Sequence, residues 1–195
     1  MVITISGSSG VGKTTIAQSL LKRLSNAGMV VSITTRDKRD NDNPGEYRYV
    51  SNWQFNLLDK FGVFLWTVDI HGNKYGTLKW SVKNALKRYD NIFMMLLVPD
   101  RVKNLLEYAR ELGSEEFVAS FYILSPSPEI LKKRLQDRGD SEFEIAKRIK
   151  DCEKWDAEAL ASDSPYIYIR NDDKVENAVE DIVDIITSGI KDQLF

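Results

Sequence analysis

Eight residues near the start of the chain, Gly7 to Thr14, have the types and spacing of a loop that binds phosphate. They read GSSGVGKT. Glycines let several backbone N–H groups curl inward toward phosphate oxygens, and a helix that begins after the loop adds its positive dipole end. Lys13 would bridge the β- and γ-phosphates, and the Thr14 hydroxyl would bind the Mg²⁺ ion that accompanies them. The pattern predicts binding of Mg-ATP.

The segments on either side of this loop agree with that prediction. Residues 1–6 form a short apolar run typical of a strand, and residues 16–24 repeat apolar positions at helical spacing. The loop therefore joins a strand to a helix, which is where a phosphate loop must lie. The residues predicted to contact ATP are Gly10, Val11, Gly12, Lys13, Thr14 and Thr15, and the predicted metal ligand is Thr14.

Strand and helix patterns alternate along the rest of the chain. Strand-like runs at 30–35, 92–98, 117–124 and 166–169 are separated by helical patterns at 78–88, 99–112, 128–136 and 142–161, and a last helix is predicted at 175–188. Uninterrupted apolar strands between helices predict an α/β fold of the P-loop NTPase type, a parallel sheet with helices on both faces.

The stretch from 47 to 76 differs, because it mixes short strands with a small helix capped by Ser51 and a turn at 71–76. It is predicted to be an inserted subdomain. We expect one domain over 1–195, made of a core at 1–34, 77–125 and 160–195, an acceptor-binding insert at 35–76 and a lid region at 126–159.

Composition narrows the class of protein. A formal net charge of -2 among 195 residues gives no basic field for nucleic acid or an anionic membrane. One cysteine, Cys152, cannot form a disulfide framework and suits a reducing compartment. The N-terminus lacks a signal-peptide pattern, and no apolar run approaches membrane-spanning length. We expect a cytoplasmic protein, either a monomer or a homodimer.

A phosphate loop does not by itself separate a kinase from other NTPases, so the residues for an acceptor matter. Arg36 and Arg39 follow a predicted strand at a spacing of three residues, and Tyr47 lies further along. Two guanidinium groups can hold one phosphate dianion, and a phenol can add a hydrogen bond. This arrangement predicts a clamp for the phosphate of an acceptor.

The surrounding segments resemble the guanylate kinase family over nearly the whole chain. They are TTRDKR at 34–39, GEYRYV at 45–50, GNKYGT at 72–77, RLQDRGDSE at 134–142 and NDD at 171–173. The resemblance implies a kinase that transfers the γ-phosphoryl group of Mg-ATP to a nucleoside monophosphate. It implies acceptor contacts at Ser32, Arg36, Arg39, Tyr47, Tyr75 and Thr77. It implies catalytic roles for Lys13, Arg39 and the lid arginines Arg134, Arg138 and Arg148, and it places Asn171 beside the adenine.

The sequence departs from the family where guanine is read. Trp66 stands where the resemblance implies a glutamate, and Leu96 and Val98 stand at the positions of two acids. An indole can stack on a base or pack in a core, but it cannot accept the hydrogen bonds of a guanine edge. The reaction class is therefore predicted more firmly than the substrate, and Trp66 is a candidate contact to the base.

Three other functions are compatible with parts of the pattern. One is a sugar-phosphate kinase resembling ribose 1,5-bisphosphate phosphokinase, because that family resembles guanylate kinases without the base-reading acids. Another is a viral-type deoxynucleotide kinase with relaxed base specificity. The third is a catalytically silent guanylate-kinase-like binding module, which Lys13 disfavours because such modules typically lose this lysine.

Overall fold

The structure is a computed structural model that describes residues 1–39, 42–70 and 72–193. Its backbone divides into two compact units, a first unit of Met1–Thr4 with Ser25–Ala119 and a second unit of Ile5–Leu24 with Ser120–Phe195. Strand β1 (Val2–Gly7) has residues in both units. The five-stranded sheet has the order β2-β7-β1-β8-β9, and the described pairs β2–β7 and β8–β9 are parallel.

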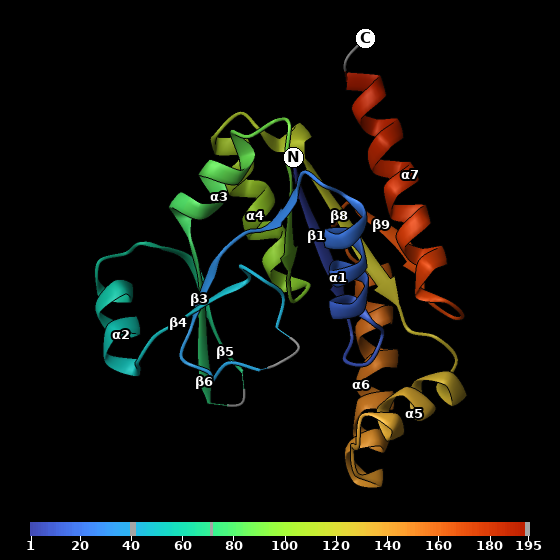
Figure 1. The fold of residues 1–195 in the computed structure, drawn as a ribbon. Helices are drawn as coiled ribbons and strands as arrows, with labels where there is room; N and C mark the ends of the chain where they lie inside the picture. Colours follow the sequence, from blue (N-terminus) through green and yellow to red (C-terminus); the bar gives the residue numbers. More distant parts are fainter. Residues whose placement is uncertain (40–41, 71, 194–195) are drawn as a thin grey trace. The chain divides into compact units, whose positions relative to one another are not determined.

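The first unit holds a second sheet of four strands in the order β4-β3-β6-β5. In this sheet β3 pairs with β4 in parallel, whereas β6 is antiparallel to both β3 and β5 (Figure 1). The elements of this unit are β2 (Ala27–Met29), β3 (Ser32–Thr34), β4 (Tyr47–Tyr49), α2 (Asn52–Lys60), β5 (Phe64–Ile70), β6 (Asn73–Leu78), α3 (Lys79–Leu86), β7 (Ile92–Leu96), α4 (Asp100–Glu111) and the short 3₁₀ helix η1 (Glu115–Phe117).

Helix α2 packs on the four-stranded sheet through a small aromatic core. The helix begins at the predicted cap, because the Ser51 hydroxyl accepts the backbone N–H of Gln54 in a capping box. Phe55 of α2 and Phe64 of β5 are buried with their rings stacked at 4.7 Å. Gly76 in β6 lets that ring approach, since a Cβ there would lie 2.7 Å from Phe64. Packing of these rings therefore fixes the sheet that carries the predicted acceptor contacts.

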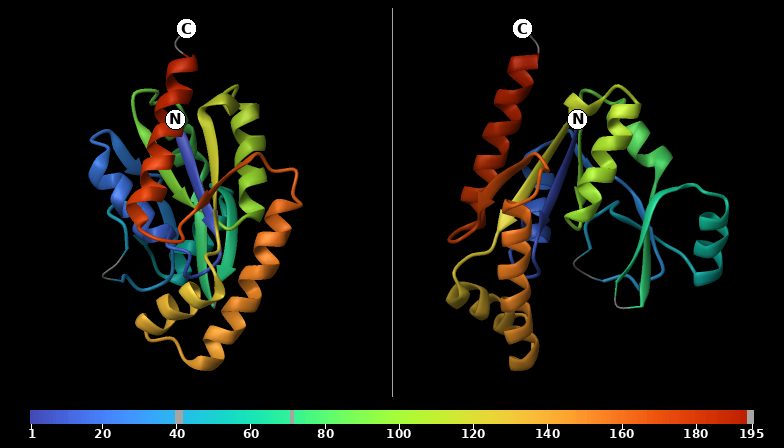
Figure 2. Two further views of the ribbon diagram at one scale, coloured as in Figure 1. Left: turned by 90° about the vertical axis from the view of Figure 1, so that its right-hand side faces the viewer. Right: turned by 180° about the vertical axis from the view of Figure 1, so that it is seen from behind.

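The second unit contains α1 (Lys13–Arg23), most of β8 (Val118–Leu124), α5 (Pro128–Asp137), α6 (Glu142–Leu160), β9 (Tyr166–Arg170) and α7 (Val175–Gln193). Helix α1 packs against α7, and α5 packs against α6 (Figure 2). A buried cluster of Leu131, Leu135, Ile145 and Cys152 joins α5 to α6. Ser127 caps α5 and Ser141 caps α6. These contacts hold the arginines of both helices near each other.

The α/β class and the parallel sheet predicted from the alternating pattern are confirmed. One local prediction was wrong, and one strand was missed. The segment 71–76 was predicted as a turn, but strand β6 begins at Asn73, because its backbone pairs with both β3 and β5. Strand β2 was not predicted, since its sequence Ala-Gly-Met has no strand pattern and it forms by pairing Ala27 with Ile92. In the part of the chain that is described, no helix is long and apolar enough to span a bilayer.

Candidate functional site

The loop between β1 and α1 is a cradle that only glycine permits. Gly7, Gly10 and Gly12 have φ angles of 139°, 91° and 102°. A Cβ at Gly7 would lie 2.5 Å from the carbonyl oxygen of Ile123, and a Cβ at Gly12 would lie 2.5 Å from Nδ2 of Asn171. Side chains are thus excluded by backbone conformation and by space. This leaves the loop's backbone free to approach an anion.

Lys13 lies folded over this loop at the first turn of α1. Its Nζ donates to the carbonyl oxygens of Gly7 and Ser8, both at 2.7 Å. Burial lowers the pKa of Lys13 from 10.5 to about 8, because a charged ammonium loses hydration there. The ammonium is therefore held by neutral oxygens and is still charged at pH 7. Phosphate oxygens could replace these carbonyls as its partners.

The other predicted ATP contacts surround the same turn. Val11 is buried, Thr14 is half-buried and Thr15 is exposed. Among the residues that the structure describes, no cluster of three His, Cys, Asp or Glu side chains could hold a metal ion. The predicted metal ligand, the Thr14 hydroxyl, would hold a Mg²⁺ ion together with phosphate oxygens and water, which suits an ion that keeps much of its hydration shell.

Asn171 ties the end of β9 to the phosphate loop. Its side chain is buried, and its Nδ2 donates to the Val11 carbonyl at 2.8 Å. Arg134 of α5 donates to the carbonyl oxygen of Asn171 at 2.7 Å. The buried Oδ1 of Asn171 has no hydrogen-bond partner among the described residues. This atom is an unused acceptor beside the loop.

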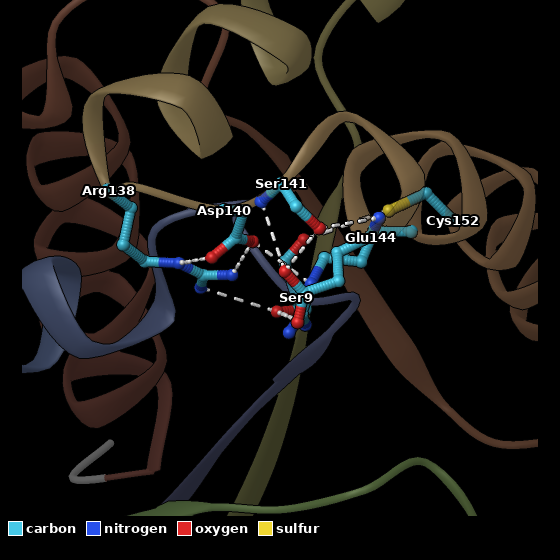
Figure 3. A network of polar contacts seen from close by, with 7 residues as sticks. Ser9, Arg138, Asp140, Ser141, Glu144 and Cys152 are labelled. Carbon is cyan, nitrogen blue, oxygen red and sulfur yellow. Dashed lines mark hydrogen bonds and ion pairs between the residues drawn. The ribbon is translucent and has the colours of Figure 1, made fainter.

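Two predicted lid arginines, Arg138 and Arg148, both contact Ser9 of the phosphate loop. Figure 3 shows Arg138 beside Asp140 and Ser9. Arg148 donates to the Ser9 hydroxyl at 2.8 Å, and Arg138 reaches the same oxygen at 3.5 Å. Both guanidinium groups pair with Asp140, the Arg148 Nε at 3.0 Å from its Oδ2. The hydrogen bond from Arg138 lowers the pKa of Asp140. The structure thus gathers Arg138 and Arg148 at the loop, with a carboxylate that the sequence prediction missed.

Among the predicted acceptor contacts, Arg36 is fixed by a carboxylate. Its Nη2 donates to Asp42 at 2.7 Å, and its guanidinium carbon lies 5.2 Å from the centre of the Tyr47 ring. Burial works against ionisation, but the hydrogen bond and charge of Asp42 raise the pKa of Arg36. Burial likewise opposes ionisation of Asp42, yet hydrogen bonds from Arg36 and Tyr49 lower its pKa to about 2. Both groups are therefore ionised at neutral pH.

The predicted phosphate clamp is only partly assembled. Tyr47 and Tyr75 pack edge to face with ring centres 5.9 Å apart, next to Arg36. Arg39 donates its backbone N–H to Asp42 at 2.8 Å, but its side chain is exposed. The structure therefore brings Arg36 together with both tyrosines and leaves the Arg39 guanidinium outside this group.

Beside these tyrosines lies a cavity of about 180 Å³ within the first unit. It is lined by Ser32, Tyr47, Trp66, Val68, Ile70, Tyr75, Gly76, Thr77, Leu96, Leu97, Val98 and Arg101. Trp66, Leu96 and Val98, which the sequence resemblance predicts to stand at the positions of the family's acids, all line it. None of the described lining residues carries a carboxylate. Ser32 and Thr77 share a hydrogen bond of 3.2 Å between their hydroxyls.

Of the residues around the site that sequence reasoning missed, two had a readable signal. Val68 and Ile70 follow Trp66 at a spacing of two, so they face the same side of β5. Asp42 and Arg101 had no such signal, because their roles depend on tertiary contacts with Arg36 and with the cavity.

The strand, the glycine loop and the helix that follows it, with a lysine and arginines around them, define a P-loop nucleotide-binding protein. The family model for guanylate kinase matches residues 1–189. The guanylate kinase of Carboxydothermus hydrogenoformans is 34% identical over 96% of this chain and 88% of its own length. That of Trichormus variabilis is 36% identical over 88% of this chain and 82% of its own. This chain belongs to the guanylate kinase family, and so to the ATP-dependent kinases of nucleoside monophosphates.

Among solved structures, the guanylate kinase of Anaplasma phagocytophilum has a TM-score of 0.68 to this chain and is 24% identical in sequence. The match covers 96% of this chain and 85% of that one. At this identity the likeness establishes the fold, and it agrees with the parallel sheet described above.

Proposed function

We propose that this chain transfers the γ-phosphoryl group of Mg-ATP to a nucleoside monophosphate, and that it does not share a strong preference for guanine. The observation that supports the second half is the cavity in which Trp66, Leu96 and Val98 gather. A guanine edge offers hydrogen-bond donors that need acceptors, and the described lining residues supply no carboxylate for them.

The donor side binds through the loop and its cations. Backbone N–H groups of 10–15 hold the phosphates, with Lys13 as a point charge and Thr14 on the metal. The Mg²⁺ ion supplies charge neutralisation when bound. The transition state of phosphoryl transfer is loose and anionic, so guanidinium groups stabilise it by charge and alignment. Arg134, Arg138 and Arg148 take this role in the proposal, and Asn171 contacts the adenine.

The acceptor side orients the second substrate. Arg36 and Tyr75 hold its phosphate, and Arg39 turns its exposed guanidinium toward it. Tyr47 supports Arg36 through the contact of their ring and guanidinium. No general base is needed, because the attacking phosphate oxygen is already an anion at pH 7. We infer that residues 35–76 form the acceptor-binding insert and that residues 126–159, which carry α5 and α6, act as the lid.

Base selection follows from the same cavity. Trp66 supplies a flat apolar surface, and Ser32 and Thr77 supply hydroxyls. Stacking and apolar contacts discriminate between ligands by about 1–3 kcal/mol, whereas an unpaired buried polar group in a dedicated site discriminates far more strongly. Selectivity among bases is therefore expected to be modest.

The test is a comparison of kcat/KM with ATP as donor. The acceptors are GMP, dGMP, AMP, dTMP, dCMP and ribose 1,5-bisphosphate. We expect turnover of several nucleotides within about a hundredfold of each other. If GMP is preferred by thousands-fold, the assignment of the base cavity is wrong. If ribose 1,5-bisphosphate is the only acceptor, or if no acceptor is phosphorylated, the proposed function itself fails.

A further inference from the structure

The size and the lining of the cavity in the first unit favour one class of ligand. Its volume of about 180 Å³ is below the range of roughly 300–1,000 Å³ typical of pockets for whole drug-sized ligands. It therefore suits one ring system, a base, better than a whole nucleotide. Its apolar walls are Trp66, Val68, Ile70, Leu96, Leu97 and Val98, and its polar groups are hydroxyls together with one cation.

That cation is Arg101, in the first turn of α4. One of its terminal nitrogens, Nη1, donates to Asn104 at 3.3 Å. Its Nε is buried and has no hydrogen-bond partner among the described residues. A guanidinium carries donors only, and a buried donor without an acceptor is unfavourable. Arg101 lines the cavity as the one charged side chain of the described lining, and the natural complement of its guanidinium donors is an acceptor such as a carbonyl oxygen.

The hydroxyls do not reverse this bias. Ser32 and Thr77 already bond to each other, which occupies one donor and one acceptor between them. Tyr47 and Tyr75 line the wall nearest Arg36. An exocyclic amino group that entered the cavity would bring two donors to a lining that offers no carboxylate. Each donor left unpaired there would weaken binding.

We propose that this cavity selects bases that carry carbonyl oxygens and no exocyclic amino group, and that Arg101 is the residue that reads the carbonyl. Hypoxanthine, uracil and thymine belong to this class, whereas guanine, adenine and cytosine do not. The proposal rests on the proposed function, because it names the acceptor class of the same site. In this cavity the 2-amino group of guanine is therefore expected to weaken binding.

Two pairs of nucleotides test the proposal on the unmodified protein. IMP differs from GMP only by the missing 2-amino group, and dUMP differs from dCMP by a carbonyl in place of the 4-amino group, which also makes N3 an N–H donor in place of an acceptor. Using both pairs separates the effect of the amino group from that of ring size. We expect kcat/KM for IMP to exceed that for GMP by about tenfold, and dUMP to exceed dCMP by a similar factor. A ratio at or below one in both pairs would overturn the proposal.

Arg101→Ala identifies the residue responsible. We expect it to lower kcat/KM about tenfold for IMP, GMP and dUMP, which carry a carbonyl at C6 or C4, with little change for dCMP, which carries an amine there. The dUMP-to-dCMP ratio should therefore fall toward one, whereas the IMP-to-GMP ratio should stay as it is in the unmodified protein. Arg101→Lys should restore part of the preference. Lys103→Ala is the matched control, because Lys103 is an exposed cation on the same helix and does not line the cavity. If Arg101→Ala and Lys103→Ala leave the dUMP-to-dCMP ratio equally unchanged, Arg101 does not read the base.

Calorimetric binding of IMP and GMP to the unmodified protein separates this proposal from the proposed function. Tighter binding of IMP without phosphorylation of any nucleotide would leave the cavity assignment standing and remove the kinase assignment. Phosphorylation with tighter binding of GMP would do the opposite.

Discussion

The phosphate loop and the proposed base cavity belong to the same family pattern, but the loop is formed by the backbone and the cavity by side chains. The loop depends on backbone conformation, with three glycines at positive φ and a Cβ excluded at Gly12 by Asn171. The cavity depends on side chains from strands β3 to β6, from the end of β7 and the residues after it, and from the start of α4. Replacing a side chain in the cavity changes which ligand fits and leaves the backbone intact. The reaction class can therefore persist while the substrate changes.

The two regions also hold their cations differently. Lys13 is bonded to two neutral carbonyl oxygens, whereas Arg36 is paired with the carboxylate of Asp42. An incoming phosphate on the donor side displaces only dipoles. On the acceptor side it must share Arg36 with a group of the same charge sign. Removing a cation on the donor side is consequently expected to lower the rate of phosphoryl transfer more than removing one on the acceptor side.

The largest effect is expected for Lys13→Ala. Loss of this point charge should lower kcat by roughly 100- to 1,000-fold or more, since it removes a charge placed where negative charge must be stabilised. The melting temperature should change little, because burial of the ammonium is already unfavourable. Lys22→Ala is the control, an exposed lysine in the same helix. Near-normal turnover by a folded Lys13→Ala protein would contradict the assignment of the loop.

Arg36→Ala should act on one substrate only. We expect the KM for the acceptor to rise by about tenfold or more and the KM for ATP to stay within about twofold, because charge-assisted hydrogen bonds to one phosphate are lost. The variant should also be less stable, since Asp42 loses its partner in a partly buried position. Arg48→Ala, an exposed arginine in β4, is the control. An equal rise in both KM values would show that the two regions do not divide the substrates.

Steady-state rates for Arg36→Ala should be compared with those for Asp42→Asn. This change frees Arg36 from its ion pair while keeping the shape of the side chain. If the acceptor phosphate competes with Asp42, the Asp42→Asn protein should have an acceptor KM no higher than that of the unmodified chain, with a lower melting temperature.

The pKa of Lys13 makes the donor side sensitive to pH. With a pKa of about 8 in the folded chain against an ordinary 10.5, the ammonium loses its proton as the pH rises through 8. At pH 9 about a tenth of the molecules keep the charge, so ATP affinity should be several-fold lower than at pH 7. Stability runs the other way: between about pH 8 and 10.5 the unfolded chain holds more protons, so the free energy of unfolding rises with pH.

Lys13→Met is the control for this pH profile, because it removes the titrating group and keeps most of its volume. Its ATP affinity and its free energy of unfolding should lose the pH dependence between 8 and 10.5. An unchanged profile in Lys13→Met would assign the effect to another group.

The same contrast explains which features of the structure could be predicted from the sequence. The motif at 7–14 predicts a loop whose geometry is set by its own glycines, and the capping serines Ser51 and Ser141 mark helix starts for similarly local reasons. The sheet order and the strand β2 depend on pairing between distant segments, which no local pattern encodes. Asp42 and Asp140 bind arginines through tertiary geometry, and so they could not be predicted from spacing.

The cavity could be predicted from the sequence in part. The sequence indicated that Trp66, Leu96 and Val98 replace acids, because the flanking motifs fixed the register. It could not indicate Arg101, whose place in the lining follows from where α4 begins after β7. A substitution inside a recognised motif can therefore be read from the sequence alone. A residue that another element brings into the cavity, such as Arg101, can be identified only from the structure.

The smallest expected effect is a change of base preference in Trp66→Glu. A carboxylate at this position would offer acceptors to the 2-amino and N1–H donors of guanine, so the GMP-to-IMP ratio of kcat/KM should rise several-fold. Its apolar neighbours would raise the pKa of the new carboxyl, whereas Arg101 in the same lining would favour its ionised form. Loss of the indole leaves space and costs stability, so the melting temperature should fall in any case.

Trp66→Gln is the matched control for that last change, because it has nearly the same shape as Trp66→Glu and carries no charge. Both variants lose stacking and should lower kcat/KM for every nucleotide. Only the glutamate should move the ratio toward GMP, and the shift should grow as the pH rises and the carboxyl ionises. Equal ratios in the two folded variants would mean that position 66 packs in the wall of the cavity without meeting the base edge.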